Sequence, residues 1–391
     1  MHSALANSAR LARPSHLCRS CQFQRRLSQA SSIGCSNGQV APRNAIRPVT
    51  WTYIPYQVPY ALGLKLQEHL VQRRADARAL LREEPSASPA AKQSPSSRLT
   101  EATEVATTDI FLLLQHSPVF TEGRRGGEYA QTPEEEAAIA KRFAEIGADY
   151  HVTKRGGLIT FHGPGQLVGY PILDLSVMNL STRCYVDKIQ TSISNLLHSS
   201  PYNLATVPPP EDHTGVWVDT SHKITSIGIQ VRHRITSHGF ALNVEADVLK
   251  WFGWIVACGI KGKGMTCIQR EIALRVQREG ATRPDRRGGQ VDEARKSDLP
   301  HEQESPSSPL PSSAGLAVAS IGPGVGLVDT PITLGPEAKA VTVESIVSPL
   351  VQQFGRTWGR EMQQADKSMF HYAADARGLL SKVIVKGKIV Q

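Results

Sequence analysis

Acidic residues are missing from the first 67 positions of this 391-residue chain, where the first carboxylate is that of Glu68. Residues 1–50 instead contain seven arginines, eight serines and no lysine. This composition is typical of an organelle transit peptide and predicts a mitochondrial leader over residues 1–50, with a disordered tail as the alternative. The formal net charge is +9, so the rest of the chain carries about +2 (9 − 7). It has no basic cluster with interleaved aromatics, so we expect no nucleic-acid binding.

Long apolar runs and clustered cysteines are missing as well. No stretch of 18 or more apolar residues occurs, so we expect no membrane-spanning helix. Six cysteines are too few and too scattered for a disulfide scaffold. Three of them, Cys184, Cys258 and Cys267, lie outside the leader. No Cys or His pair follows Cys18-x-x-Cys21 at zinc-site spacing, so we expect no metal site.

Phosphate-binding motifs are also lacking. The chain contains neither Gly-x4-Gly-Lys-Ser/Thr nor a Gly-x-Gly-x-x-Gly that opens a helix. Gly262-Lys-Gly264 resembles only part of such a loop. A nucleotide-binding fold is therefore disfavoured, and the neutral, apolar, glycine-lined surroundings suit an acyl chain better than a triphosphate.

Composition divides the chain into one globular domain and several additional segments. The domain spans residues 51–276 and contains a disordered insertion at about 83–107, rich in Pro, Ser and Ala. A second insertion over 277–340 has no lasting periodicity and is predicted to be disordered. A helix within 341–360 completes the domain, and residues 361–391 form an unassigned tail.

Hydrophobic periodicity predicts helices and strands within the domain. Leu62, Leu66 and Leu70 recur every four residues, so 60–82 is an amphipathic helix. Another helix begins near Ser181 or Thr182, and a third covers 133–147. Strands are predicted over 51–60, 109–115, 215–218, 223–231 and 240–244.

The densest group of special residues is Arg155-Gly-Gly-Leu-Ile-Thr-Phe-His-Gly-Pro-Gly-Gln166. Leu158–Phe161 is β-branched and aromatic, which predicts a strand. Gly163-Pro164-Gly165 predicts a sharp turn, and the apolar run 167–173 is the expected partner strand. A plain hairpin needs fewer glycines and no histidine between them, so the density of special residues favours a functional segment over a plain glycine-cornered hairpin.

Cys258 is the best candidate for a nucleophile. It precedes Gly259 in a loop with two further glycines, where backbone amides can approach a bound oxygen. A thiol attacks as a thiolate, so a nearby cation is needed, from Lys223 or from the lysines at 261 and 263. His162 and His238 are candidate bases. The alternatives are a buried structural cysteine and hydrogen-bonded histidines at strand ends.

Four motifs in order resemble those of the lipoyl(octanoyl) transferase family. They are Arg155–Gln166, Lys223-Ile-Thr-Ser-Ile-Gly228, His238-Gly-Phe-Ala-Leu-Asn-Val244 and Ala257-Cys-Gly259. The resemblance covers roughly 50–275 and the last helix near 342–358. The chain departs from the compact family pattern through its leader and its two insertions. After Cys258, the run Gly262-Lys-Gly-Met-Thr266 matches the family motif only in its Gly and Thr character.

The resemblance implies an α+β fold like that of the biotin and lipoate protein ligase catalytic domain, with mixed β-sheets and flanking helices. It implies a mitochondrial acyltransferase that moves an octanoyl group from octanoyl-acyl carrier protein to a lysine of lipoyl domains, without ATP, a metal or another cofactor. Acceptors would be the lipoyl domains of 2-oxo acid dehydrogenase E2 subunits and the glycine cleavage H protein.

The resemblance also implies roles for particular residues. Cys258 would be the nucleophile that forms an octanoyl thioester, and Lys223 would lower the pKa of the thiol and shuttle its proton. The acyl pocket would be lined by Arg155, Gly156, Gly157, Leu158, Ile159, Thr160, Phe161, His162, Ser226, Ile227, Gly228, Gly239, Phe240 and Ala241.

Three other functions stay open at this point. An ATP-dependent lipoate or biotin protein ligase would share the fold but need no cysteine at position 258. An amidotransferase would take the octanoyl group from another protein. A nucleic-acid-binding or scaffold protein would depend on the basic pI of about 9.3 alone.

Overall fold

The computed structural model describes residues 47–83, 97–125, 132–211, 213–256, 263–281, 322, 324 and 332–390, all within one unit, 42–391. Its main sheet has the strand order β10-β8-β9-β6-β2-β1-β11, with β7 also paired to β8. The strands are β1 (Val49–Val58), β2 (Asp109–His116), β6 (Gln166–Ile172), β7 (Val216–Trp217), β8 (His222–Arg232), β9 (Ile235–Asn243), β10 (Gly264–Met265) and β11 (Met362–Gln364). The sheet is mixed, because β1 runs parallel to β2 and β11 whereas β2, β6, β9 and β8 are successively antiparallel.

Two smaller sheets accompany the main one. The first has the order β4-β3-β5, from β3 (Val119–Glu122), β4 (Asp149–Val152) and β5 (Thr160–His162). The second is an antiparallel sheet of β12 (Phe370–Ala374), β13 (Leu380–Val385) and β14 (Lys388–Val390).

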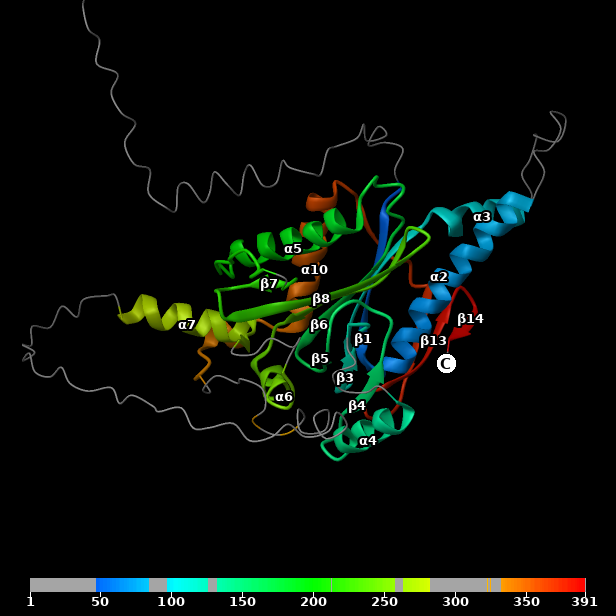
Figure 1. The fold of residues 1–391 in the computed structure, drawn as a ribbon. Helices are drawn as coiled ribbons and strands as arrows, with labels where there is room; N and C mark the ends of the chain where they lie inside the picture. Colours follow the sequence, from blue (N-terminus) through cyan, green and yellow to red (C-terminus); the bar gives the residue numbers. More distant parts are fainter. Residues whose placement is uncertain are drawn as a thin grey trace, which may run out of the picture. The chain divides into compact units, whose positions relative to one another are not determined.

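Strand β2 is buried on both faces, because its apolar side chains alternate between two clusters. Phe111 and Leu113 belong to the cluster that includes α5 (Thr182–His198) and α10 (Val343–Trp358). Leu112 and Leu114 belong to the cluster that includes α2 (Tyr60–Glu83) and strands β12 to β14. In Figure 1, α5 and α10 accordingly lie across the main sheet from α2.

Capping residues fix where several helices begin. The Ser181 hydroxyl accepts a hydrogen bond from the Cys184 N–H and starts α5, as predicted. Thr132 forms a capping box with Glu135 at the start of α4 (Pro133–Ala144). The other helices are α3 (Ser97–Thr107), α6 (Leu249–Phe252), α7 (Ile268–Ala281), α9 (Pro336–Lys339) and the 3₁₀ turn η3 (Ala246–Val248).

The predicted fold class is confirmed: mixed β-sheets are flanked by helices in an α+β arrangement. The helix predicted over 60–82 forms as α2, the last predicted helix forms as α10, and the strand predicted over 109–115 forms as β2. The hairpin predicted downstream of Lys223 forms from β8 and β9. Residues 1–46 of the predicted leader lie outside the described residues.

The hairpin predicted around Gly163-Pro164-Gly165 is wrong. Residues 158 and 159 are not in a strand, and β5 pairs with β3 in the small sheet. β6 pairs with β2 and β9 in the main sheet. The turn still forms, with Gly165 at φ 84°, but the Gly165 carbonyl accepts from Val244 and Glu245 and so directs the chain into the other sheet.

The predicted disorder of 83–107 is wrong for its second part, which forms α3. This helix is held by tertiary contact, since Ala102 and Ala106 pack against Ala77 of α2. The tail over 361–391 is also more structured than predicted: it forms β11 to β14, and Phe370 and Val383 are buried against α2. Within the insertion over 277–340, the described residues are the end of α7 (277–281), residues 322 and 324, and the segment 332–340 that contains α9.

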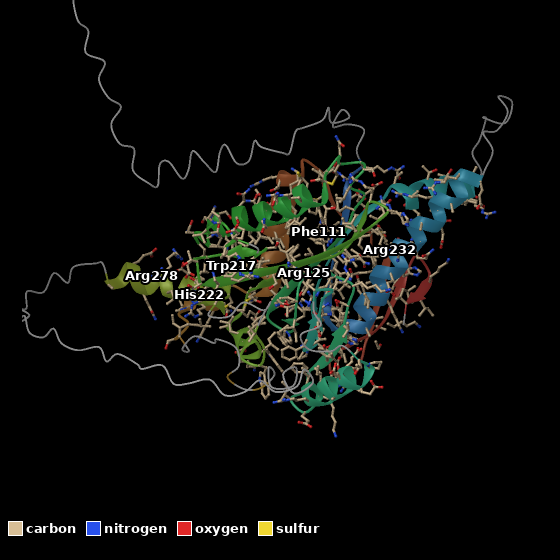
Figure 2. The ribbon with its side chains drawn as sticks, in the orientation of Figure 1. Phe111, Arg125, Trp217, His222, Arg232 and Arg278 are labelled. Atoms are coloured by element: carbon tan, nitrogen blue, oxygen red, sulfur yellow. The ribbon has the colours of Figure 1, made fainter. Side chains whose placement is uncertain are left out.

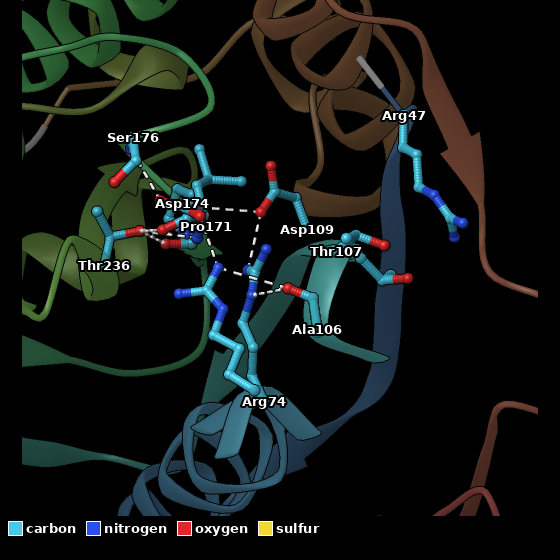
Figure 3. Close-up of polar contacts among 12 residues, drawn as sticks. Arg47, Arg74, Ala106, Thr107, Asp109, Pro171, Asp174, Ser176 and Thr236 are labelled. Carbon is cyan, nitrogen blue, oxygen red and sulfur yellow. Dashed lines mark hydrogen bonds and ion pairs between the residues drawn. The ribbon is translucent and has the colours of Figure 1, made fainter. Parts of the chain in front are cut away.

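A buried carboxylate joins distant parts of the domain. Asp109 at the start of β2 accepts from Nη1 of Arg74 at 2.8 Å and from Nη1 of Arg360 at 2.8 Å. It also accepts from the N–H of Asp174 at 3.0 Å, and Figure 3 shows Asp109 with Arg74 and Asp174. A buried charge persists only when it is paired and hydrogen-bonded, as this one is.

Candidate functional site

A cavity of about 350 Å³ opens where the three-stranded sheet of β3, β4 and β5 meets the main sheet. Its wall comes from α2, the loop before β5, β5, β6, the segment before β7, and the paired strands β8 and β9. The lining residues are Tyr60, Arg125, Arg155, Gly157, Leu158, Thr160, His162, Val168, Tyr170, His213, Thr214, Lys223, Ser226, Ile227, Gly228, His238, Gly239, Phe240 and Ala241.

The structure brings most of the sequence-predicted wall residues together at this cavity. Those that line it are Arg155, Gly157, Leu158, Thr160, His162, Lys223, Ser226, Ile227, Gly228, Gly239, Phe240 and Ala241. Ile159 and Phe161 do not line the cavity. Both are fully buried in the hydrophobic cluster of the β3–β4–β5 sheet, and Phe161 stacks on Trp251. Gly156 contributes its N–H to the Ile229 carbonyl at 2.9 Å and does not line the cavity.

The predicted nucleophile, Cys258, lies in the segment 257–262, outside the described residues, as does Lys261. The segment is attached at both ends to described structure. On its far side, β10 pairs in parallel with β8, with Gly264 opposite His222 and Met265 opposite Lys223. The Thr266 N–H also donates to the Lys223 carbonyl at 2.9 Å. The residues after the segment are therefore fixed directly to the strand that carries Lys223.

Two glycines of the wall are required by close approach of the backbone. A Cβ on Gly239 would lie 2.1 Å from the Gly169 carbonyl oxygen of the neighbouring strand. A Cβ on Gly228 would lie 2.7 Å from the Gly156 carbonyl oxygen. Real Cβ atoms do not approach oxygen so closely, so glycine lets three segments of backbone close around the cavity.

Arg155 places a buried positive charge in the wall. Its guanidinium donates to the Thr121 hydroxyl at 2.8 Å and to the Leu158 carbonyl at 3.0 Å. These contacts tie the loop 155–158 to β3. Arg155 therefore shapes the loop and also sets the electrostatic potential that the neighbouring ionisable groups feel.

His162 is held in one tautomer. Its Nδ1 lies 2.8 Å from Oε1 of Gln166, whose Nε2 donates to the Asn243 side chain at 2.9 Å. An amide oxygen only accepts, so Nδ1 of His162 carries the proton. Burial, and then electrostatic interactions with His116 and Arg155, lower the pKa of His162 well below its ordinary value. The imidazole is therefore neutral, with Nε2 unprotonated.

A second neutral histidine supports Tyr170. Nδ1 of His116 lies 2.8 Å from the Val58 carbonyl and so donates, which makes Nε2 the acceptor for the Tyr170 hydroxyl at 2.6 Å. Burial lowers the pKa of His116 to about 4 and raises the pKa of Tyr170 well above its usual value. Neither group is charged at neutral pH, so this side of the cavity is polar but uncharged.

His238 lines the cavity in a strained conformation. It has a φ of 54° within β9, a left-handed value that is uncommon for a residue other than glycine. Its N–H donates to Oε1 of Gln67 on α2 at 2.7 Å. Burial, and then the charge on Arg155, lower its pKa to about 4. Strain of this kind recurs at functional sites, where the surrounding structure maintains it.

Lys223, one of the three lysines that the sequence offered as a cation for Cys258, is buried. Its side chain is 2% exposed, and Nζ donates to the Thr214 carbonyl at 3.2 Å. The same Nζ lies 4.9 Å from the centre of the Trp217 ring. Figure 2 labels Trp217 on β7 and Arg125 near the cavity.

Several lining residues escaped the sequence-based prediction. Tyr60, Arg125, Val168, Tyr170, His213 and Thr214 come from four separate parts of the chain, and His238 was proposed as a base but not as part of the wall. Tyr60 begins a helix after Pro59, which gives no signal of a cavity. Tyr170 lies next to Gly169 in the predicted strand 167–173, and its place in the wall could have been found only with the pairing of β6 and β9 in hand.

The described residues contain no group of three or more His, Cys, Asp or Glu side chains placed to hold a metal ion. Within the same ranges, no helix has the length and apolar character needed to cross a membrane.

Residues 91–282 match the family of lipoyl protein ligase A/B catalytic domains. The chain is 39% identical over 228 residues to human "octanoyl-[acyl-carrier-protein]:protein N-octanoyltransferase LIPT2, mitochondrial", covering 58% of this chain and 86% of that protein. It is 46% identical over 165 residues to the Xenopus tropicalis protein of the same name, covering 42% of this chain and 64% of the relative. The chain thus spans slightly less than two thirds of the frog, zebrafish and fruit-fly relatives that it matches.

A solved structure, a putative lipoate protein ligase from T. acidophilum, aligns with a TM-score of 0.38 and 11% identity over 82% of this chain and 88% of that one. The sequence matches place the chain among the catalytic domains of lipoyl ligases and transferases. Within that class, it belongs to the lipoyl(octanoyl) transferase family. The predicted family is therefore confirmed, and the mitochondrial location predicted from residues 1–50 agrees with the names of these relatives.

Proposed function

We propose that the protein transfers an octanoyl group from octanoyl-acyl carrier protein to a lysine of lipoyl domains. The observation that carries this proposal is the cavity: its wall is built from the family motifs, and it is neutral on the side of His116 and Tyr170. A volume of about 350 Å³ accommodates an eight-carbon chain. The acceptors we propose are the lipoyl domains of 2-oxo acid dehydrogenase E2 subunits and the glycine cleavage H protein.

The proposed reaction has two steps through a thioester on Cys258. The Cys258 thiol loses its proton to solvent, and the thiolate, stabilised by the Lys223 ammonium group, attacks the carbonyl of the octanoyl thioester; the ammonium group can then supply the proton that the departing carrier thiol needs. The bond to the carrier thiol breaks, and that thiol leaves with a proton. The amine of the acceptor lysine then attacks the acyl-enzyme, an amide bond forms, and Cys258 leaves as the thiol. Covalent catalysis of this kind divides one difficult acyl transfer into two easier ones.

The intact mass of the full-length chain after mixing with octanoyl-acyl carrier protein tests the proposal. We expect one octanoyl adduct that hydroxylamine removes and that is absent from Cys258→Ser. Addition of a lipoyl domain should discharge the adduct and place the octanoyl group on the domain. An adduct at Cys184 or Cys267, or full transfer by Cys258→Ser, would contradict the assignment of the nucleophile.

Parallel reactions separate the competing functions. Free octanoate or lipoate with ATP should give no product, because the ligase reaction requires an acyl-adenylate. An octanoyl-protein offered as the donor should react far more slowly than octanoyl-acyl carrier protein. Product formation that depends on ATP would favour a ligase, and a preference for the octanoyl-protein would favour an amidotransferase.

A further inference from the structure

One aromatic ring contacts two ammonium groups beside the nucleophile loop. Trp217 on β7 is fully buried and pairs with Lys223 of β8 across the sheet. Its ring centre lies 4.9 Å from Nζ of Lys223 and 5.3 Å from Nζ of Lys263. The indole N–H donates to the His213 carbonyl at 3.3 Å, which fixes the orientation of the ring. An ammonium group at this distance from an indole is attracted by its π electrons.

Backbone carbonyls complete the environment of both lysines. Lys223 donates to the Thr214 carbonyl at 3.2 Å, and Lys263 donates to the Thr220 carbonyl at 2.9 Å. Across the described ranges, neither lysine forms an ion pair with a carboxylate. Carbonyls and an aromatic ring hold an ammonium group without neutralising it. The positive charge therefore remains able to act on a nearby anion.

Gly215 makes room for this arrangement. Its φ of 144° is in the region that favours glycine, and a Cβ there would lie 2.6 Å from the Thr225 carbonyl oxygen and 3.2 Å from Cδ of Lys223. The segment from His213 to Trp217 thus surrounds the Lys223 side chain: the Thr214 carbonyl accepts from its ammonium group, Gly215 leaves space for its methylene groups, and the Trp217 ring lies beside Nζ. This arrangement gives the ammonium group a defined position.

The second lysine links the ring to the nucleophile loop. Lys263 is the first described residue after the segment 257–262 that holds Cys258, and Gly264 next to it donates its N–H to the Ser221 carbonyl at 2.9 Å. The Trp217 ring therefore holds Lys223 and also the residue that ends the loop. A substitution of Trp217 would therefore disturb both Lys223 and Lys263.

We propose that Trp217 is a positioning residue for the acyl transfer, which holds Lys223 and Lys263 as a pair of cations without a carboxylate partner among the described residues. This inference rests on the proposed function. Trp217 acts through the two lysines. In this arrangement, Lys263 adds a second positive charge that favours the thiolate form of Cys258.

Alkylation of Cys258 by iodoacetamide, followed by peptide mass against pH, measures this effect without any acyl donor. In Trp217→Leu we expect the midpoint pH of alkylation to rise by roughly 0.5–1 unit, from the usual strength of a cation–π contact. The rate of octanoyl-thioester formation at pH 7 should fall about three- to tenfold with it, because that shift reduces the thiolate fraction by this factor. Trp217→Phe keeps an aromatic face and should shift the midpoint by less than half as much.

Trp358→Leu is the matched control, because it also removes a buried indole from the core, where Trp358 packs against Phe111 and Phe354. Its midpoint should equal that of the wild type. If Trp217→Leu does not fold, Lys263→Met and Trp217→Phe test the inference in its place, and both variants should raise the midpoint pH of Cys258 alkylation. A wild-type midpoint in both, or an equal shift in Trp358→Leu, would overturn the role of Trp217.

The outcome also separates this inference from the proposed function. A wild-type chain that acquires no thioester from octanoyl-acyl carrier protein refutes the function itself. A wild-type chain that is acylated, together with a raised midpoint in Lys223→Met and an unchanged one in the Trp217 variants, refutes only the inference.

Discussion

Nη1 of Arg360 lies 2.8 Å from Oδ2 of Asp109, on the opposite oxygen from Arg74. Arg74 is on α2, Asp109 begins β2, and Arg360 follows α10. All three side chains are buried, and Arg360 also contacts the Arg47 carbonyl before β1. One carboxylate thus joins four parts of the chain at the start of β2, an interior strand of the main sheet.

Removal of this carboxylate should strongly destabilise the domain. Asp109→Ala leaves two buried guanidinium groups without a counter-charge, which typically costs about 3–5 kcal/mol. We expect the free energy of unfolding in urea to fall by this amount. Arg377→Ala is the control, since it breaks an ion pair with Asp375 in which Arg377 is 80% exposed and should cost less than about 1 kcal/mol. Equal losses in the two variants would show that Asp109 is not a structural centre.

A methyl group in the cavity wall should disrupt both the fold and the chemistry. In Gly239→Ala the new Cβ would lie 2.1 Å from the Gly169 carbonyl oxygen, and backbone cannot move aside as a flexible side chain can. We expect a loss of about 1–3 kcal/mol in the free energy of unfolding and at least a tenfold loss in the rate of thioester formation. The measurements are urea unfolding and intact mass against time.

Gly280→Ala is the matched control for that substitution. Gly280 lies in α7, where a Cβ would meet no atom within 4 Å. Alanine is the better helix former, so this variant should be unchanged or up to about 1 kcal/mol more stable. If Gly239→Ala behaved like Gly280→Ala, β6 and β9 would be less closely packed than described here.

Acid should destabilise the protein through its buried histidines. Burial lowers the pKa of His116 and of His238 to about 4, from an ordinary value of 6.5. Between these values the unfolded chain binds more protons than the folded one, so the free energy of unfolding falls as the pH falls. Their contribution is complete above about pH 6.5 and is lost progressively towards pH 4, by roughly 3 kcal/mol for each histidine. Urea unfolding at pH 7.5, 6 and 5 measures this loss.

His238→Asn should reduce that acid sensitivity. Asparagine does not titrate and tolerates the left-handed conformation that His238 adopts at φ 54°. The variant should therefore lose less stability between pH 7.5 and 5 than the wild type. His371→Asn replaces an exposed histidine of β12 and should keep the wild-type slope. The same slope in all three proteins would mean that other groups cause the acid effect.

The sequence was sufficient for the parts of the fold that depend on local pattern. The repeat of Leu62, Leu66 and Leu70 predicted α2, and the apolar run after Asp109 predicted the strand that forms as β2. Local hydrophobic periodicity gave a wrong prediction where the pairing of a strand depends on residues distant in the sequence. Residues 160–162 and β6 are neighbours in the chain but pair in different sheets, because the Gly165 carbonyl is bound by residues 244 and 245.

The turn between β13 and β14 in the third sheet has a local signal in the sequence. Lys386 and Gly387 have φ values of 44° and 81° and connect β13 to β14. A two-residue hairpin turn with positive φ at both positions favours glycine, so Lys-Gly between two apolar runs is a hairpin signal, although weaker than Asn-Gly or Asp-Gly. The helix α3 carried none, because Ala102 and Ala106 gain their burial only against α2.

The wall of the cavity was predictable where the residues form continuous motifs, as at 226–228 and 239–241. It was not predictable where single side chains arrive from separate elements. Tyr60 of α2 and Tyr170 of β6 meet His162 of β5 and His116 of β2 only because four elements converge, and no spacing in the sequence encodes that convergence. Trp217 was part of a predicted strand, but its contact with two lysines requires the pairing of β7, β8 and β10.

Cys267 should be chemically inert although it is close in sequence to the proposed nucleophile. It is fully buried, and burial raises its pKa to about 12, so almost no thiolate exists at neutral pH. Iodoacetamide at pH 7.5 should therefore modify Cys258 and leave Cys267 unmodified in the folded protein, and Cys267→Ala should keep octanoyl-thioester formation within about twofold of the wild type. Peptide mass after alkylation provides the measurement, and the same treatment in urea is the control in which Cys267 becomes reactive. Alkylation of Cys267 at the rate of Cys258 in the folded protein would contradict its burial and would reopen the choice of nucleophile.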